Sequence, residues 1–148
     1  MARQQGFTLV ELLVVLFVLS IVAMLAVPVY KDYATRTKVA EGLSLASPIK
    51  SLITEFYILN GRLPLDAVEL HLSDPSQYFG KWTESIGIAN VPSNATITIT
   101  YSNAKLPRLE GNNTITLVPR ETGRGTLTWD CTGGTVVEDL RPKSCRVP

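Results

Sequence analysis

The stretch MARQQGFTLVELLVVLFVLSIVAMLAVPVY, residues 1–30, decides how the rest of this chain is interpreted. Its only charged side chain after Arg3 is Glu11. The apolar run from Leu12 to Tyr30 is about 28 Å long as a helix, at roughly 1.5 Å per residue. The hydrocarbon core of a bilayer is about 30 Å thick, so we expect this segment to span a membrane as a helix.

Three other interpretations of this segment fit less well. A secretory signal peptide has an apolar core of about 7–15 residues before a small-residue cleavage site, whereas this run is longer and ends in Val27-Pro28-Val29. A plain membrane anchor leaves Glu11 unexplained, because a carboxylate at the bilayer centre costs about 2.5–3.5 kcal/mol. A buried core helix has too little remaining chain to cover it. Basic residues flank both ends, so charge does not settle the orientation.

After residue 30 the chain is long enough for one small domain. Apolar side chains there recur at helical spacing, at Leu45, Ile49, Leu52, Ile53 and Phe56. We therefore expect one helix from about Phe7 to Leu59, stopped by Asn60-Gly61. Pro28 lies inside this helix, and its missing N–H predicts a kink near Met24–Pro28, with gentler bends near Gly42 and Pro48.

The second half of the chain predicts strands. A connecting loop with turn signals at Asp74-Pro75 is expected to be pinned down by packing of Tyr78, Phe79 and Trp82. Apolar residues then alternate with threonines, and the candidate strands are residues 85–90, 94–102, 113–119 and 125–131. We expect an α+β fold in which a long N-terminal helix packs on an antiparallel sheet of about four strands.

The two cysteines, Cys131 and Cys145, lie near the C-terminus beside turn residues. In a chain with an export-type N-terminus, this placement favours a disulfide formed in an oxidising compartment over two reduced core thiols. A disulfide closing such a loop contributes roughly 3 kcal/mol in the chain-entropy model. The cysteines and the single histidine, His71, do not have zinc-ligand spacing.

The sequence shows no constellation of residues for catalysis. It has no glycine-rich phosphate loop, metal-ligand spacing or nucleophile motif, so we expect neither enzyme activity nor a cofactor. His71 is expected to be solvated. Acidic and basic residues are interleaved between Lys105 and Arg146, so any DNA binding is expected to be weak and salt-sensitive. Asn94-Ala95-Thr96 fits a glycosylation sequon, which is a short and common pattern.

The N-terminal residues resemble the processing site of type IV pilins. Gly6-Phe7-Thr8-Leu9-Val10-Glu11-Leu12 is similar to a short leader ending in Gly, followed by Phe-Thr-Leu-x-Glu. The resemblance continues through Pro28 and the stretch Tyr30-Lys31-Asp32-Tyr33, and more loosely to the C-terminal cysteine pair. The chain departs from the family at Gln5, where Lys or Arg is usual, and at Ser20, where many members have Gly.

This resemblance implies a division of the chain into a leader (1–6), a membrane-spanning and filament-core helix (7–30) and a head (31–148). The head would comprise the second half of the helix (31–59), an αβ loop (60–84), the sheet (85–131) and a disulfide-bounded region (131–145). A membrane-embedded prepilin peptidase would cut between Gly6 and Phe7 and methylate the new amino terminus of Phe7. Glu11 would pair with Phe7 of a neighbouring subunit, and Ser20 and Pro28 would bracket a segment that loses helical structure in the filament.

The function implied is that of a structural subunit that polymerises into a helical surface pilus for adhesion, twitching motility and, in some members, DNA uptake. The implied partners are further copies of the chain, the inner-membrane assembly platform with cytoplasmic ATPases acting indirectly, and a host-surface receptor. Before assembly, the subunit would sit in the inner membrane with its head in the periplasm. The alternatives are a minor pilin and a type II secretion pseudopilin, which usually has an Asp-rich calcium loop and no C-terminal disulfide.

Overall fold

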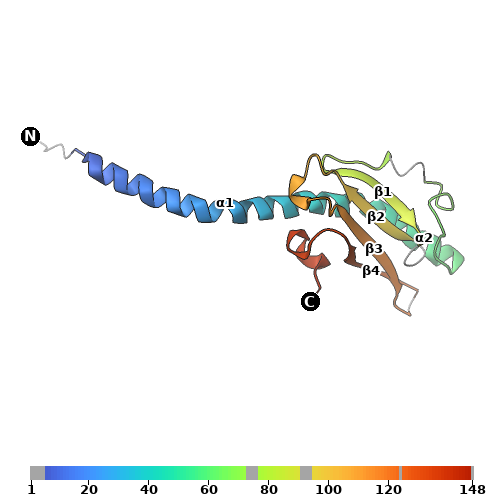
Figure 1. Ribbon diagram of the computed structural model, residues 1–148. Helices are drawn as coiled ribbons and strands as arrows, with labels where there is room; N and C mark the ends of the chain where they lie inside the picture. Colours follow the sequence, from blue (N-terminus) through green and yellow to red (C-terminus); the bar gives the residue numbers. More distant parts are fainter. Residues whose placement is uncertain (1–5, 73–76, 91–94, 124, 148) are drawn as a thin grey trace, which may run out of the picture. The chain divides into compact units, whose positions relative to one another are not determined.

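The computed structural model describes residues 6–72, 77–90, 95–123 and 125–147. Leader residues 1–5, the turn at Asp74-Pro75 and Asn94 of the sequon lie outside the described residues. The expected α+β fold is confirmed, with a long N-terminal helix, an antiparallel sheet and a C-terminal disulfide. The main elements are α1 (Leu9–Leu45), α2 (Ser47–Asn60), β1 (Thr83–Ala89), β2 (Thr96–Tyr101), β3 (Thr114–Glu121) and β4 (Leu127–Gly134) (Figure 1).

The chain divides into two compact units, Met1–Ala34 and Thr35–Pro148, and α1 contributes to both. We call the second unit the head. The expected helix start at Phe7 is wrong by two residues, because the Thr8 side chain caps the helix and α1 begins at Leu9. α1 continues through Pro28 without ending there. The kink expected near this proline stays a prediction.

A short interruption at Ala46 separates α1 from α2. The Ala46 backbone stays in the helical region, and its N–H donates to the Gly42 carbonyl at 2.9 Å. Pro48, in the first turn of α2, has no N–H to donate to the carbonyl four residues earlier, which weakens the helix at this point. α2 ends at Asn60 as expected, where Gly61 adopts a left-handed φ of 67° and donates its N–H to the Tyr57 carbonyl.

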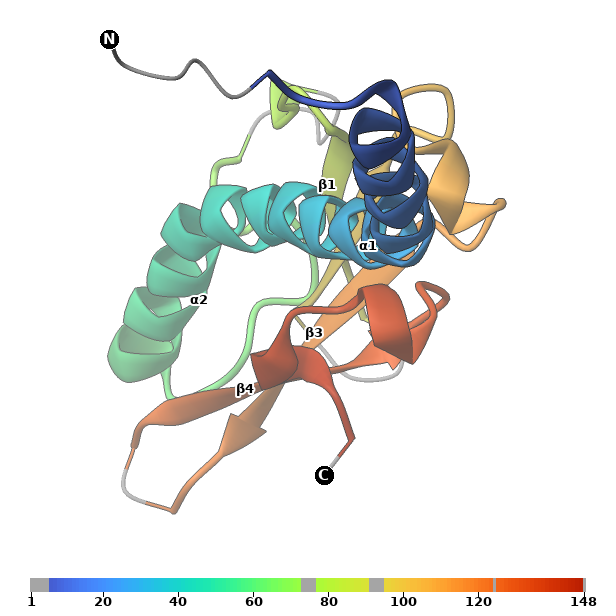
Figure 2. The same ribbon diagram turned by 90° about the vertical axis from the view of Figure 1, so that its left-hand side faces the viewer.

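The four strands form one antiparallel meander in the order β1-β2-β3-β4. Ile97 of β2 lies opposite Leu117 of β3, and Ile99 lies opposite Ile115, so the apolar residues share one face as the alternation predicted. α2 and the adjoining end of α1 lie over that face of the sheet (Figures 1 and 2). The pairing of β3 with β4 shifts between Thr116 and Val118, where β4 carries an extra residue.

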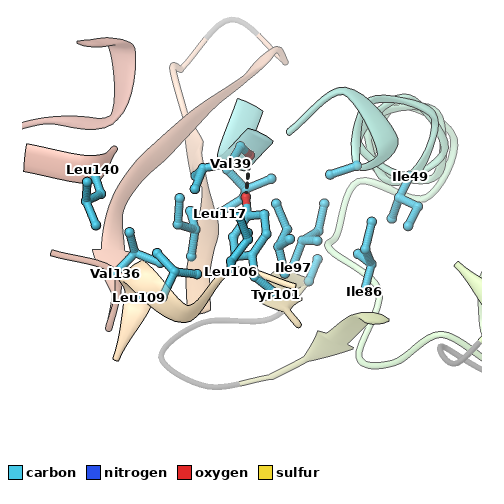
Figure 3. Close-up of a cluster of buried hydrophobic side chains, with 14 of the residues drawn as sticks. Val39, Ile49, Ile86, Ile97, Tyr101, Leu106, Leu109, Leu117, Val136 and Leu140 are labelled. Carbon is cyan, nitrogen blue, oxygen red and sulfur yellow. Dashed lines mark hydrogen bonds between the residues drawn. The ribbon is translucent and has the colours of Figure 1, made fainter. Parts of the chain in front are cut away.

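The core of the head is centred on Tyr101, whose side chain is fully buried between the helices and the sheet (Figure 3). The Tyr101 hydroxyl donates a hydrogen bond of 2.6 Å to the Val39 carbonyl of α1, and burial raises the pKa of this phenol strongly. Gly42 permits this contact, because a Cβ at that position would lie 2.6 Å from the Tyr101 hydroxyl oxygen. The absence of a side chain at Gly42 therefore lets α1 pack directly against Tyr101 of the sheet.

Two apolar side chains expected inside are on the surface. Leu52 was placed on the core-facing stripe of the helix but is 38% exposed, while its neighbours Ile49 and Ile53 are buried. Phe79 was expected to pin the connecting loop but is 68% exposed. Tyr78 and Trp82 do pack against the core, so the loop is fastened by two of its three aromatic residues.

We predict that Gly42→Ala lowers the free energy of unfolding by about 1–3 kcal/mol, because the new methyl group overpacks the contact with Tyr101. Urea unfolding of the full chain in detergent micelles, followed by tryptophan fluorescence, measures this change. Gly87→Ala is the matched control, since a Cβ at Gly87 meets no atom within 4 Å. Equal unfolding midpoints for the two variants would contradict the packing role of Gly42.

Candidate functional site

The first unit contains the apolar part of α1. Its large apolar side chains from Leu9 to Val29 are exposed on every side of the helix, with Phe17 at 67% and Met24 at 80%. Within the described residues, one helical stretch, Leu9–Asn60, is long and apolar enough to cross a membrane. A helix that is apolar all round is normally buried in lipid or against other helices.

Aromatic residues mark the end of this apolar segment. Tyr30 and Tyr33 are 71% and 67% exposed, one helical turn apart, and Lys31 and Asp32 lie between them. Tyrosine is enriched where a membrane helix meets water, because its ring is apolar and its hydroxyl is polar. From Tyr30, about 30 Å of helix at roughly 1.5 Å per residue reaches back to about Val10. A helix placed in a bilayer with Tyr30 at one surface would have Glu11 near the other surface, where a carboxylate is tolerated more readily than at the bilayer centre.

The residues of the expected cleavage and assembly sites lie together at the start of α1. Gly6 and Phe7 are outside the helix, and Phe7 is 80% exposed. The Thr8 hydroxyl accepts the backbone N–H of Glu11 at 3.3 Å, which places Glu11 in the first helical turn. No side chain in the described part of the chain binds the Glu11 carboxylate. A negative charge is favourable at this end of the helix dipole, but Glu11 still has its hydrogen-bonding capacity available for another chain.

Ser20 and Pro28 lie further along the same helix. The Ser20 hydroxyl donates to the Phe17 carbonyl at 2.7 Å, so it is satisfied within the helix. Pro28 has no N–H, and the Met24 carbonyl therefore loses its normal helical donor. The helical ladder is weakened at Met24 while it remains intact around Ser20.

At the other end of the chain, the expected disulfide is present. Cys131 of β4 is bonded to Cys145, with their Cα atoms 4.8 Å apart. Val136, Leu140 and Cys145 are buried, so the disulfide-bounded region contributes to the core of the head and is not an independent surface loop.

Arg141, a basic residue of this region, lies inside the head. Arg141 is only 7% exposed. Its guanidinium donates to the carbonyls of Thr132, Gly133, Gly134 and Val136. Five N–H donors in a fixed plane suit such a cluster of carbonyl oxygens. Arg141 thus fastens the C-terminal segment to the irregular end of β4, beside the disulfide.

Two more arginines hold the same segment. Arg36 of α1 donates to the Asp139 carbonyl at 2.6 Å, and Arg146 donates to the carbonyls of Asp139 and Arg141. Much of the positive charge near the disulfide is therefore engaged with the backbone. Sequence reasoning missed these roles because carbonyl acceptors leave no pattern in the amino-acid sequence.

A carboxylate on α1 holds the end of the αβ loop. Glu41 accepts the backbone N–H groups of Lys81 and Trp82 at 2.9 and 2.8 Å. The Trp82 ring also lies beside two ammonium groups, those of Lys38 at 4.3 Å and Lys81 at 5.0 Å. Cations over an indole ring add to this attachment. These contacts identify the aromatic residue Trp82 as part of the fold and not as a ligand platform.

The beginning of the loop is also held in place. Arg62 and Glu69 form a bidentate ion pair with both distances at 2.9 Å. The Arg62 hydrogen bonds, helped by the Leu65 backbone N–H, lower the pKa of the Glu69 carboxyl. His71 is exposed, as the sequence indicated. Among the residues that the structure describes, no three His, Cys, Asp or Glu side chains are grouped so that they could hold a metal ion.

One hollow of the head lies between α2 and β4. It has a volume of about 480 Å³, and its lining includes Lys50, Thr54, Ile58, Leu59 and Trp129. Ile58 and Leu59 are 66% and 76% exposed. Tyr78, Phe79 and Trp82 do not line this hollow. Its apolar lining gives α2 a surface that the sheet does not cover.

Comparison with protein-family models gives two matches that together cover most of the chain. The model for pilins, described as bacterial filament proteins, matches residues 35–146. The model for the prokaryotic N-terminal methylation motif matches residues 1–27. The two matches correspond to the head and to the apolar segment with its leader.

Individual relatives agree with these family matches. The chain is 29% identical over 143 residues to the fimbrial protein EcpC of Eikenella corrodens, a match covering 97% of this chain and 91% of that protein. It is 34% identical over 103 residues to the type IV major pilin PilE of Neisseria gonorrhoeae, covering 70% of this chain and 62% of PilE. A crystal structure of a Pseudomonas aeruginosa type IV pilin superposes with a TM-score of 0.55 at 23% identity, covering 76% of this chain and 97% of that one. That likeness shows the fold.

We predict that Arg141→Met lowers the free energy of unfolding by about 2–3 kcal/mol, because buried carbonyls lose a charged donor. Urea unfolding of the oxidised full chain in micelles measures the loss. Lys143→Met, in the same segment but exposed, serves as the control and should change stability by less than about 0.5 kcal/mol. If both variants unfold at the wild-type urea concentration, the guanidinium does not hold the segment.

A second prediction concerns acid stability. Hydrogen bonds from the Thr132 side chain and backbone, and then from Arg120, lower the pKa of Asp130 from 3.8 to about 2. A lowered folded-state pKa means that the Asp130 contribution is complete above about pH 4 and is lost as the pH falls towards 2. Asp130→Asn should therefore flatten the stability profile between these pH values. Asp139→Asn is the control and should retain the wild-type slope. An unchanged slope in Asp130→Asn would rule out this origin of the acid sensitivity.

Proposed function

This chain belongs to the pilin family of bacterial filament proteins, and on that premise we propose that it polymerises through its apolar helix into a type IV surface pilus. It is a structural subunit of the pilus, as its relatives are. The observation that carries the proposal is the fully exposed apolar helix, which finds no covering surface in its own chain. Packing against copies of itself would cover that helix once it has left the lipid.

Processing would come first. The subunit would enter the inner membrane through residues 7–30 with its head in the periplasm. A prepilin peptidase on the cytoplasmic side would cut between Gly6 and Phe7 and methylate Phe7. The match of residues 1–27 to the N-terminal methylation motif supports this step. The exposure of Phe7 and its place outside the helix are also compatible with cleavage.

The role of Glu11 would then be to set the register of the filament. Its carboxylate has no partner among the described residues, and the amino terminus of Phe7 on a neighbouring subunit is a suitable cation. Such a pair attracts strongly in a low-dielectric bundle, although desolvation offsets much of that gain. An incorrect axial offset would leave a charge buried without a partner. The cost of burying an unpaired charge at an incorrect axial offset is therefore enough to select the correct offset.

Pro28 would have a mechanical role. The Met24 carbonyl already lacks its helical donor, so the segment between Ser20 and Pro28 is the part of the apolar helix that is easiest to unwind. In the filament this segment would lose helical structure and allow the pilus to stretch.

The work of the pilus would include adhesion to a host-surface receptor and twitching motility. The inner-membrane assembly platform would add and remove subunits, with cytoplasmic ATPases acting indirectly through it. DNA uptake is the weaker assignment, because several arginines of the head are engaged with its own backbone. The major pilin names of relatives such as PilE favour a main subunit over a minor pilin, and the Cys131–Cys145 disulfide favours a pilin over a secretion pseudopilin.

The experiment that tests this function is electron microscopy of filaments sheared from the cell surface, combined with mass spectrometry of their subunit. We expect a subunit whose mass begins at N-methylated Phe7. Absence of the chain from surface filaments, with the same processed mass in the inner membrane, would support the pseudopilin instead.

We predict that Glu11→Val leaves cleavage and membrane insertion intact but reduces surface filaments by at least about tenfold, since unfavourable register is no longer penalised. Glu11→Gln, which keeps the size but removes the charge, should act in the same direction. Val15→Ile is the control, because it alters an exposed apolar side chain of the same helix without changing charge. Normal filaments from Glu11→Val would refute the role in register.

A further inference from the structure

We propose that Thr8 is a positioning residue for leader cleavage, because its hydroxyl caps the start of α1 and so keeps the preceding Gly6–Phe7 peptide bond outside the helix. The inference rests on the proposed cleavage at this bond. In that step, water is added across the amide, so that Gly6 leaves with the new carboxylate and Phe7 keeps the new amine. The peptidase must therefore reach a peptide bond directly beside the start of a long helix.

The hydrogen bonds at the start of α1 identify Thr8 as the N-cap. Its carbonyl accepts the Leu12 N–H at 3.2 Å, as the first helical bond, and its Oγ1 atom accepts the Glu11 N–H at 3.3 Å. Gly6, Phe7 and Thr8 are non-helical, and α1 begins at Leu9. An N-cap residue has non-helical backbone angles while its side chain satisfies one of the free N–H groups of the first turn.

Sequence alone would permit the helix to begin earlier. Phe7 is apolar and continues the pattern that follows it, and the expectation from periodicity was a helix starting at that residue. An uncapped N–H is especially costly near lipid, where water is scarce, so a helix without this cap gains by extending towards the membrane surface. Extension through Phe7 would place the bond to be cut against the first helical turn. Chain cleavage occurs preferentially in exposed, non-helical segments.

The cap also leaves Glu11 available. Thr8 and Glu11 have the Thr-x-x-Glu spacing of a capping box, in which the glutamate returns a hydrogen bond to the backbone of the cap residue. Only the threonine half is formed here, since within the described residues the Glu11 carboxylate binds no N–H group. One residue thus fixes where the helix begins without engaging the carboxylate that the filament would use.

The test measures cleavage of the full chain in detergent micelles by purified prepilin peptidase. Three variants test whether the N-cap hydrogen bond of Thr8 or the shape of its side chain controls the cleavage rate. Thr8→Val keeps the branched shape but has no acceptor, Thr8→Ser keeps the hydroxyl, and Thr8→Asn has a different shape but is a strong N-cap. We expect Thr8→Val to be cut about fivefold more slowly, whereas the serine and asparagine variants keep a rate near that of the wild type. Backbone NMR shifts of Phe7 should become helical in Thr8→Val alone.

The possible results separate a failure of the positioning role of Thr8 from a failure of the proposed cleavage at Gly6–Phe7. If the wild-type chain is not cut at Gly6–Phe7, the proposed processing is wrong. If the wild type is cut and Thr8→Val is cut equally fast, the positioning role of Thr8 is overturned. If the asparagine variant is slow while the serine variant is fast, the peptidase recognises the hydroxyl directly, and the capping explanation is likewise overturned.

Discussion

The structure depends on one constraint, which is that the apolar side chains in the first part of α1 are exposed on all sides of the helix in the described part of the chain. The core of the head is built entirely from residues beyond Thr35, and its sheet has a single apolar face, which α2 and the last turns of α1 already cover. The proposed pilus function gives the first part of α1 two apolar environments in turn, lipid before assembly and neighbouring copies afterwards. A protein with this property is stable only in a membrane or in an assembly.

The head is organised to be a firm attachment for that helix. Tyr101 reaches through the core to a carbonyl of α1, and Gly42 gives the space for the contact. Glu41 on the same helix holds the end of the αβ loop, and Arg36 holds the C-terminal segment. The αβ loop and the C-terminal segment are thus both tied to the helix through polar contacts to the backbone. Pulling on the helix would load these contacts together, and this arrangement suits a subunit of a fibre under tension.

The fold class was predictable because its signals are local and repetitive. The apolar run, the stripe at Ile49 and Ile53, the stop at Gly61 and the alternation along β2 each follow from the period of one element. The errors were at places where two elements meet. Leu52 and Phe79 are exposed because of how the helix and loop are packed. Arg141 is buried because its guanidinium reaches carbonyls five to nine residues earlier in the chain, at the irregular end of β4. The N-cap at Thr8 had a recognisable pattern, Thr-x-x-Glu, but the stronger apolar periodicity masked it. The proposed pairing of Glu11 would lie between molecules, so a single chain does not contain it.

The contacts that hold the C-terminal segment also affect the edge of the sheet. β4 is an edge strand of the sheet, and a free edge is a template on which a strand of another molecule can add. Arg141 occupies carbonyl groups at the end of β4, and the disulfide holds the following segment beside them. In a fibre, many copies of this sheet are concentrated at close range. Arg141 and the disulfide therefore limit strand pairing at the end of this edge. In the proposed filament this would help to keep neighbouring heads from joining into one continuous sheet, so that each subunit could be withdrawn as a separate molecule.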